Sequence, residues 1–162
     1  MPAGNTYSQI ASTTLGSAAA SVTFSSIAGT YTDLVLVCDI KASAINNEVW
    51  IQCNGDTAAN YSATTLVGNG TSPASYRYSN INYAYPQIST DPGSQNAIVQ
   101  FMNYSNTTTY KTILSRSNNV ANLVQTTVSL WRSTSAINSI LVYANGTYPI
   151  GATFNLYGIS AA

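Results

Sequence analysis

The chain has 162 residues, of which only five are basic and five acidic, and it contains no histidine. This length suits one domain, because chains divide into separate cores only beyond about 250 residues. A net charge of zero argues against nucleic-acid binding, which depends on Lys and Arg neutralising phosphates. The lack of histidine removes the usual general base near neutral pH and the commonest metal ligand.

Charged residues make up 6% of the chain, against about 25% in an ordinary soluble domain. Apolar residues make up 45%, which is ample for a core, so the low charge does not indicate disorder. The surface must therefore be covered by Ser, Thr, Asn and the 12 Tyr. A net charge near zero favours association, and we expect an assembled protein with much of its surface covered by neighbours.

The N-terminal residues 1–14 are polar and carry no strong structure signal before Ile10. We expect them to form an arm that orders on binding a partner, ahead of one β-sandwich domain over residues 15–162. No basic region followed by an apolar stretch opens the chain, so we expect no signal peptide. The longest apolar run, residues 34–38, is too short to cross a membrane.

The first half of the domain has a hydrophobic period of two. Residues 21–25 alternate, which places Val22 and Phe24 on one face of a strand. Residues 33–40 are apolar at nearly every position, as in a strand covered on both faces. Residues 49–53 form the next predicted strand, and Asn-Gly-Asp at 54–56 ends it with a turn.

The middle, residues 58–94, is less regular and holds several turn signals, among them Pro73, Pro86 and the Asp-Pro-Gly at 91–93. We expect long loops with short edge strands there. Further strands are predicted at residues 97–102, 110–116, 126–131, 137–143 and 153–159. This spacing predicts an all-β protein, an antiparallel two-sheet β-sandwich of jelly-roll type.

Paired carboxylates would indicate a glycosidase, but Asp33 and Asp39 flank one strand and lie roughly 20 Å apart along it. Asp56 and Asp91 sit in turns without the acid spacing of a calcium loop. Serines have no histidine beside them to accept a proton. We therefore expect no enzyme, no metal and no cofactor. Cys38 and Cys53 fall in strand-like runs as small buried residues, and the sequence leaves open whether they pair.

A tyrosine-rich segment is the one local feature that suggests a contact surface. Its candidate residues are Tyr76, Arg77, Tyr78, Tyr83 and Tyr85. Tyr offers a flat apolar ring and a hydroxyl at little entropic cost, which suits protein contacts and stacking on sugars. The alternative is that these rings pack over the end of the sandwich or against another copy of the chain.

Several segments together resemble a family of small virion proteins of tailed bacteriophages, encoded among head and tail genes. The resemblance spans most of the chain but is weak over residues 72–95. It lies in residues 15–27 and 29–36, in the Asn-Gly-Asp at 54–56 with the Asn-Tyr-Ser at 60–62, and in residues 131–134, 136–140 and 154–159.

The resemblance implies a non-enzymatic structural part of a virion and transfers no catalytic residue. One implied role is a decoration, or cement, protein that binds the major capsid protein on the outside of the head as a homotrimer. The alternative is a tail-fibre or receptor-binding module that recognises host glycans. A free-standing domain without heptads or a repetitive shaft favours the decoration protein. The trimer is an analogy with other phage proteins, and no residue pattern indicates it.

Overall fold

The computed structural model describes residues 6–42, 48–86, 93–119 and 123–160. Over these residues the backbone forms eleven strands and no helix, which confirms the predicted all-β class. The strands are β1 (Tyr7–Thr14), β2 (Ala19–Phe24), β3 (Asp33–Ala42), β4 (Val49–Cys53), β5 (Tyr61–Gly68), β6 (Pro73–Ile81), β7 (Gly93–Phe101), β8 (Lys111–Asn119), β9 (Leu123–Trp131), β10 (Ile140–Tyr148) and β11 (Thr153–Ile159). In this described part, nothing forms a helix of the length and apolarity that a bilayer crossing needs.

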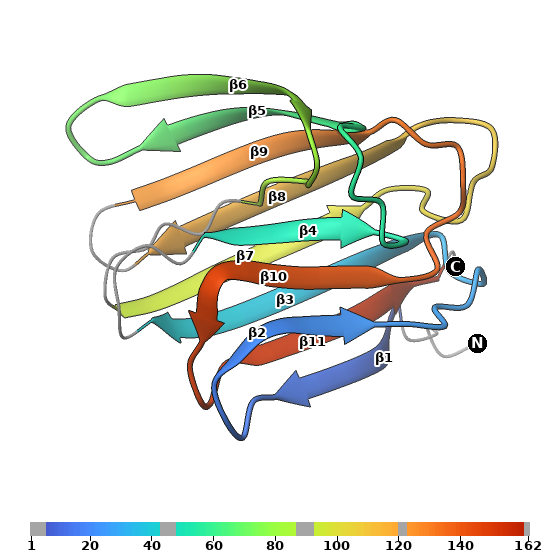
Figure 1. Ribbon diagram of the computed structural model, residues 1–162, viewed down its shortest axis with the longest axis horizontal. Helices are drawn as coiled ribbons and strands as arrows, with labels where there is room; N and C mark the ends of the chain where they lie inside the picture. The colour runs from blue at the N-terminus through green and yellow to red at the C-terminus, as the bar shows by residue number, and fades with distance from the viewer. Residues whose placement is uncertain (1–5, 43–47, 87–92, 120–122, 161–162) are drawn as a thin grey trace.

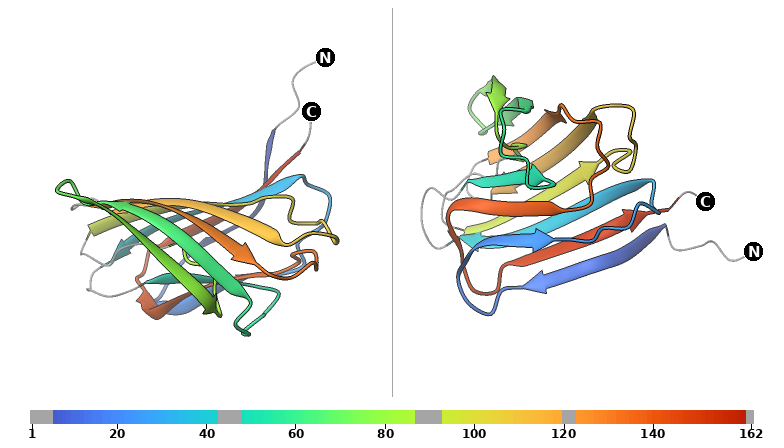
Figure 2. Two further views of the ribbon diagram at one scale, coloured as in Figure 1. Left: turned by 90° about the horizontal axis from the view of Figure 1, so that it is seen from above. Right: turned by 45° about the vertical axis from the view of Figure 1, so that its right-hand side comes forward.

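The strands form two antiparallel sheets that stack as a jelly-roll-like sandwich, as predicted (Figure 1). The large sheet has eight strands in the order β1-β11-β3-β7-β8-β9-β5-β6, and the small sheet has three in the order β2-β10-β4. The small sheet lies on one face of the large sheet, which twists strongly from β1 to β6 (Figure 2). We call the face of the large sheet turned away from the small sheet the outer face. No described strand covers it.

The core fills the space between the two sheets. The large sheet contributes alternate side chains such as Leu34 and Leu36 of β3 and Phe154 of β11, and the small sheet contributes Ile51 and Val142. All five are fully buried. Burial of such a side chain contributes roughly 1.5–3 kcal/mol to folding, so these two inner faces hold the sandwich together.

The prediction of an N-terminal arm over residues 1–14 is wrong for residues 7–14. Tyr7–Thr14 is β1, an edge strand that pairs with β11 from Tyr7 opposite Ile159 to Thr14 opposite Thr153. The register shifts between Gln9 and Ala11, so this strand carries a bulge. The bulge interrupts the period-two pattern, and the polar composition hides the rest. Residues 1–5 lie outside the described residues.

Over residues 58–94 the prediction of long loops with short edge strands is partly wrong: β6 is an edge strand, but β5 and β6 have eight and nine residues. The segment contains β5 and β6, a hairpin that extends the large sheet at its far edge. Asn69 ends β5, and its side-chain oxygen accepts hydrogen bonds from the backbone N–H groups of Thr71 and Ser72, both at 3.0 Å. The two strands pair in regular register from Ser62 opposite Ser79 to Gly68 opposite Pro73, and the register shifts between Tyr61 and Ser62. Their exposed faces hold residues of mixed character, which concealed the strands in the sequence.

The two cysteines lie in different sheets, Cys38 on β3 and Cys53 on β4, and both thiols are free. Both side chains are buried in the core, which answers the question that the sequence left open. Burial raises the pKa of the Cys38 thiol to about 12, and burial also raises the pKa of the Cys53 thiol. Both residues therefore act as small apolar core residues.

Candidate functional site

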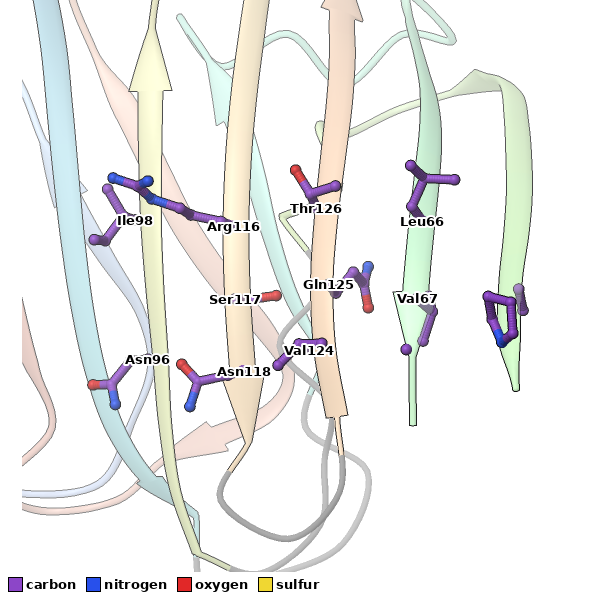
Figure 3. Close-up of a pocket in the computed structure, with 13 residues that line it drawn as sticks. Leu66, Val67, Asn96, Ile98, Arg116, Ser117, Asn118, Val124, Gln125 and Thr126 are labelled. Atoms are coloured by element: carbon purple, nitrogen blue, oxygen red, sulfur yellow. The ribbon is translucent and has the colours of Figure 1, made fainter. Parts of the chain in front are cut away.

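The register of the large sheet shows which side chains share the outer face, because directly opposite residues of antiparallel strands point to the same side. Three rows cross β7, β8, β9 and β5. The Arg116 row is Ile98, Arg116, Thr126 and Leu66; the Leu114 row is Gln100, Leu114, Val128 and Thr64; the Asn118 row is Asn96, Asn118, Val124 and Gly68. In Figure 3 the labelled members of the Arg116 row lie side by side across these four strands.

Apolar side chains gather on this face, and we call five of them the apolar patch: Leu66, Ile98, Leu114, Val124 and Val128. Val124 is 64% exposed, Leu66 58%, Val128 49% and Leu114 38%, and Ile98 is half-buried. Single exposed apolar residues are ordinary on protein surfaces, whereas a contiguous group indicates an interaction site. The patch spreads on both sides of the line between β8 and β9, which makes this line its centre.

The outer face is hollowed. One hollow has a volume of about 620 Å³ and is lined by Ile98, Arg116, Leu66 and Pro73, among others; Figure 3 shows Leu66 on the far side of Thr126 from Arg116 and Ile98. A second hollow of about 230 Å³ is lined by Ile98, Leu114 and Arg116, among others. A third, of about 200 Å³, lies beside Val128 and Arg77. The face is therefore uneven, with apolar side chains standing beside open hollows.

Four charged residues with described side chains lie on the outer face. Asp33 and Asp39 lie on β3, whereas Arg116 lies on β8 and Arg77 on β6. Asp33 is held in place by two donors: Gln100 Nε2 donates to Oδ2 at 3.2 Å, and the Asn103 backbone N–H donates to Oδ1 at 2.6 Å. Asp33, Asp39, Arg77 and Arg116 thus share one face.

The contact surface predicted from the sequence is not one surface in the structure, because its residues lie in two separate groups. Tyr78, Tyr83 and Tyr85 come together with Trp50 of β4 and Tyr143 of β10. We call these five rings the aromatic cluster. Trp50 and Tyr83 are stacked with ring centroids 4.9 Å apart and planes at 22°, and Tyr143 meets Trp50 edge-on at 5.3 Å. Tyr85 contacts Tyr78 at 4.9 Å and Tyr83 at 5.9 Å.

The aromatic cluster fastens the chain that follows β6 onto the small sheet. Between Tyr83 and Tyr85, Ala84 forms a bridge to Ile51 of β4, with backbone hydrogen bonds of 2.8 and 3.0 Å. Glu48 accepts a hydrogen bond from Trp50 Nε1 at 3.2 Å. Burial, with the nearby charge of Glu48, raises the pKa values of Tyr83 and Tyr85, so both hydroxyls stay neutral at physiological pH. Each ring contacts another ring of the cluster, which supports the packing alternative for these three tyrosines.

Tyr76 and Arg77 lie apart from the aromatic cluster, on β6. Tyr76 stands opposite Thr65 and is 52% exposed. Arg77 stands opposite Thr64, which places it on the outer face at the end of the Leu114 row. The sequence predicts one surface for the five residues, but the structure places them in two separate places.

Asp56 serves the fold through three hydrogen bonds. Asp56 accepts hydrogen bonds from Trp131 Nε1 at 2.7 Å, Asn60 Nδ2 at 2.9 Å and the Ala58 backbone N–H at 2.9 Å. Partial burial acts to raise the pKa of Asp56, but these three donors outweigh it and lower that pKa. Lys111 is buried, and its ammonium donates to the backbone carbonyls of Thr109 and Thr134 at 2.9 and 3.2 Å. In the described ranges, no group of three or more metal-ligating side chains comes together.

Sequence reasoning missed the apolar patch. Leu114 and Val128 both lay within strands that it predicted, but a period of two does not tell which face of a strand stays uncovered. Leu66 and Val124 lay outside the predicted strands, in the irregular middle and just before residue 126. The sequence signal for the patch is a spacing: Leu114 and Arg116 are two positions apart, and Val124 and Val128 are four, so each pair shares one face of a strand.

No family model matches the sequence, and no curated protein matches it. Among solved structures, the chain is similar to exo-inulinase from Aspergillus awamori (TM-score 0.45, 12% identity, 94% of this chain and 29% of that one). It is also similar to galectin LEC-6 from Caenorhabditis elegans (0.40, 9%, 93% and 96%) and to an alginate lyase from Aplysia kurodai (0.33, 7%, 84% and 72%). The chain thus spans less than a third of the exo-inulinase. These likenesses concern the fold alone.

Proposed function

We propose that this protein is a non-enzymatic structural protein of a tailed-bacteriophage virion. In this proposal it is a capsid decoration protein that binds the major capsid protein on the outside of the head as a homo-oligomer and stabilises the shell. The assignment to a virion rests on the sequence resemblance. The structure adds a sandwich with an uncovered outer face. We propose no reaction, metal or cofactor for it.

The observation that carries the proposal is the outer face. Its apolar patch is bordered by amides and hydroxyls such as Asn96, Asn118, Gln100 and Thr64, and by Arg116 and Arg77. An apolar centre with a polar surround is the composition of protein contact surfaces.

The test is a head that lacks the protein. Particles made without the gene should lose their DNA at a lower temperature than wild-type particles, and addition of the purified protein should restore the wild-type temperature. The protein carrying Val128→Glu, a change at the centre of the apolar patch, should restore it poorly. Heads that are equally stable without the protein, or that do not bind it, would contradict the proposal.

A second candidate is a tail-fibre module that recognises host glycans, and the aromatic cluster is the observation that favours it. Trp50, Tyr83 and Tyr143 are half-buried, so each keeps part of its surface in solvent, and aromatic rings stack on sugars. Under this function, Tyr78→Ala and Tyr83→Ala should abolish binding to host cells without unfolding the protein. Tyr110→Ala, at an exposed ring outside the cluster, is the matched control.

A further inference from the structure

We propose that the edge strand β6 is a docking site for an extended segment of another protein, which adds to the large sheet as a further antiparallel strand. The inference deepens the proposed function and rests on it for the identity of the partner, because it names the kind of capsid segment that the protein binds. Strand addition draws its affinity from backbone hydrogen bonds and its specificity from alternate side chains. The partner is a segment with an extended backbone, an acidic residue and apolar neighbours.

The described strands leave four sheet edges, and β6 is the edge that offers a long and regular strand. β1 carries a bulge, and the edge of β4 is covered by the bridge between Ile51 and Ala84. β2 has six residues, and its pairing with β10 is irregular. β6 has nine residues, pairs among the described strands only with β5, and keeps a regular register from Pro73 to Ser79. Bulges, short strands and covers protect sheet edges from added strands, and β6 lacks these three.

Both ends of β6 are fixed, so the edge has its shape before anything binds. At the turn before β6, the Asn69 side chain accepts hydrogen bonds from the backbone N–H groups of Thr71 and Ser72. Near the other end of the strand, Arg132 Nη2 donates a hydrogen bond to Asn80 Oδ1 at 3.0 Å. A preformed strand loses little conformational entropy when a partner pairs with it, so β6 is a suitable template for an added strand.

Two side chains of β6 belong neither to the core nor to the aromatic cluster, and they give the edge its specificity. Tyr76 stands opposite the buried Thr65, on the inner side of the sheet, and is 52% exposed. Arg77 stands opposite Thr64, on the outer side; it is exposed and makes no hydrogen bond or ion pair with another described residue. An added strand sends its own side chains alternately to the same two sides. An apolar residue can then lie beside Tyr76 and an acidic residue beside Arg77.

The position of Arg77 distinguishes a different partner from a second copy of this chain. Arg77 is the middle residue of β6, which runs from Pro73 to Ile81. A full-length antiparallel pairing with β6 of a second copy would set Arg77 opposite Arg77, and like charges directly opposite each other destabilise a sheet. A strand with Asp or Glu at this position gains an opposite-charge pair instead. The charge therefore favours an acidic segment of another protein over self-pairing.

The first experiment measures binding of a synthetic peptide to the purified full chain. The probe is acetyl-Thr-Val-Glu-Val-Thr-Val-amide, whose Glu can lie opposite Arg77 while its Val residues lie on the side of Tyr76. We expect saturable binding with a Kd on the order of 1 mM, and slowed exchange of backbone amides in residues 73–81 but not in residues 7–14. Slowed exchange in both segments, or in neither, would overturn the inference. Slowed exchange at high protein concentration without peptide would show pairing with a second copy and would overturn it as well.

The second experiment exchanges the two charges. The same peptide with Lys in place of Glu should bind the native chain about fivefold more weakly, because it meets Arg77 with a like charge. Arg77→Glu should reverse this preference, so that the Lys peptide binds more tightly than the Glu peptide. Ile150→Glu adds a negative charge at a side chain that is 69% exposed and lies between β10 and β11, and it should keep the native preference. Equal binding of the two peptides, or a preference that Arg77→Glu does not reverse, would contradict the inference.

The third experiment separates this inference from the proposed function. Heads that carry the protein should show slower amide exchange in residues 73–81 than the free protein does. A protein that stabilises heads while β6 exchanges as fast as in the free protein leaves the virion function standing and overturns the strand addition. A protein that binds the probe through Arg77 but is absent from purified particles leaves the edge site standing and overturns the virion function.

Discussion

Leu114 on β8 and Val128 on β9 lie directly opposite each other, and both side chains point away from the only other sheet among the described residues. Val128 is 49% exposed and Leu114 38%. A cross-strand apolar pair stabilises a sheet modestly, but its location on an uncovered face gives it no role in the core. This pair is the centre of the apolar patch, and the account of the protein as an assembly component depends on it.

The first prediction compares two valines on opposite sides of the architecture. Val142→Ala removes a fully buried side chain from β10 and should lower the free energy of unfolding by about 2 kcal/mol, through lost burial and the cavity left behind. Val128→Ala should lower it by no more than about 0.5 kcal/mol. Urea unfolding at low protein concentration measures both. Equal effects would mean that Val128 belongs to the core of the monomer.

The second prediction concerns pH. The folded state lowers the pKa of Asp56 through its hydrogen bonds to Trp131 and Asn60. A lowered pKa adds stability that is present above the unfolded value of about 4 and is lost as the pH falls through the folded value. The free energy of unfolding should therefore decrease below about pH 4. Asp56→Asn should lower stability at pH 7 and reduce this decrease. An unchanged acid profile in Asp56→Asn would contradict the assignment.

The third prediction concerns the two thiols. Because Cys38 and Cys53 are buried and burial raises both pKa values, neither should react with a thiol reagent in the native protein at pH 8. Both should react at once in guanidinium chloride without a reductant, because both are free. Titration with a chromogenic disulfide gives the two counts. Thiols that are missing after unfolding and appear only when a reductant is added would indicate a disulfide and contradict the structure.

The fourth prediction concerns the aromatic cluster as a fastening for the chain after β6. Tyr83→Ala removes the ring stacked on Trp50 and should lower the free energy of unfolding by about 1–3 kcal/mol. It should also shift tryptophan fluorescence to longer wavelength, because Trp50 gains contact with water. Tyr110→Ala, at a ring that is 55% exposed, is the control and should change neither measurement. If Tyr83→Ala changed neither the free energy of unfolding nor the tryptophan fluorescence, the cluster would not hold this segment.

The sequence predicts the class and the sandwich because alternation along strands such as residues 21–25 and 153–159 is a local property. It fails for residues 7–14, since a bulge at Ile10 breaks the alternation and the pairing with β11 depends on residues more than a hundred positions away. The sequence does not predict the full length of β5 and β6, because their outer face holds apolar residues such as Leu66 beside polar residues such as Thr64, which hides the period of two. Only the register shows which strands are neighbours.

The same limit explains the candidate site. Tyr76, Arg77 and Tyr78 are consecutive in sequence, yet a strand sends neighbours to opposite faces, so Arg77 lies on the outer face and Tyr78 joins Tyr85. Trp50 could not be placed beside Tyr83 without the bridge between Ile51 and Ala84. The apolar patch draws on four strands, and no local pattern reports that their exposed residues are contiguous.

The central claim is that the protein is a repeated structural part of a virion head. The most direct measurement is its copy number in purified particles, by quantitative mass spectrometry against the major capsid protein. The account predicts hundreds of copies per particle at a fixed ratio to the capsid subunit. A handful of copies would place the protein in the tail, and its absence from the particle would contradict the claim altogether.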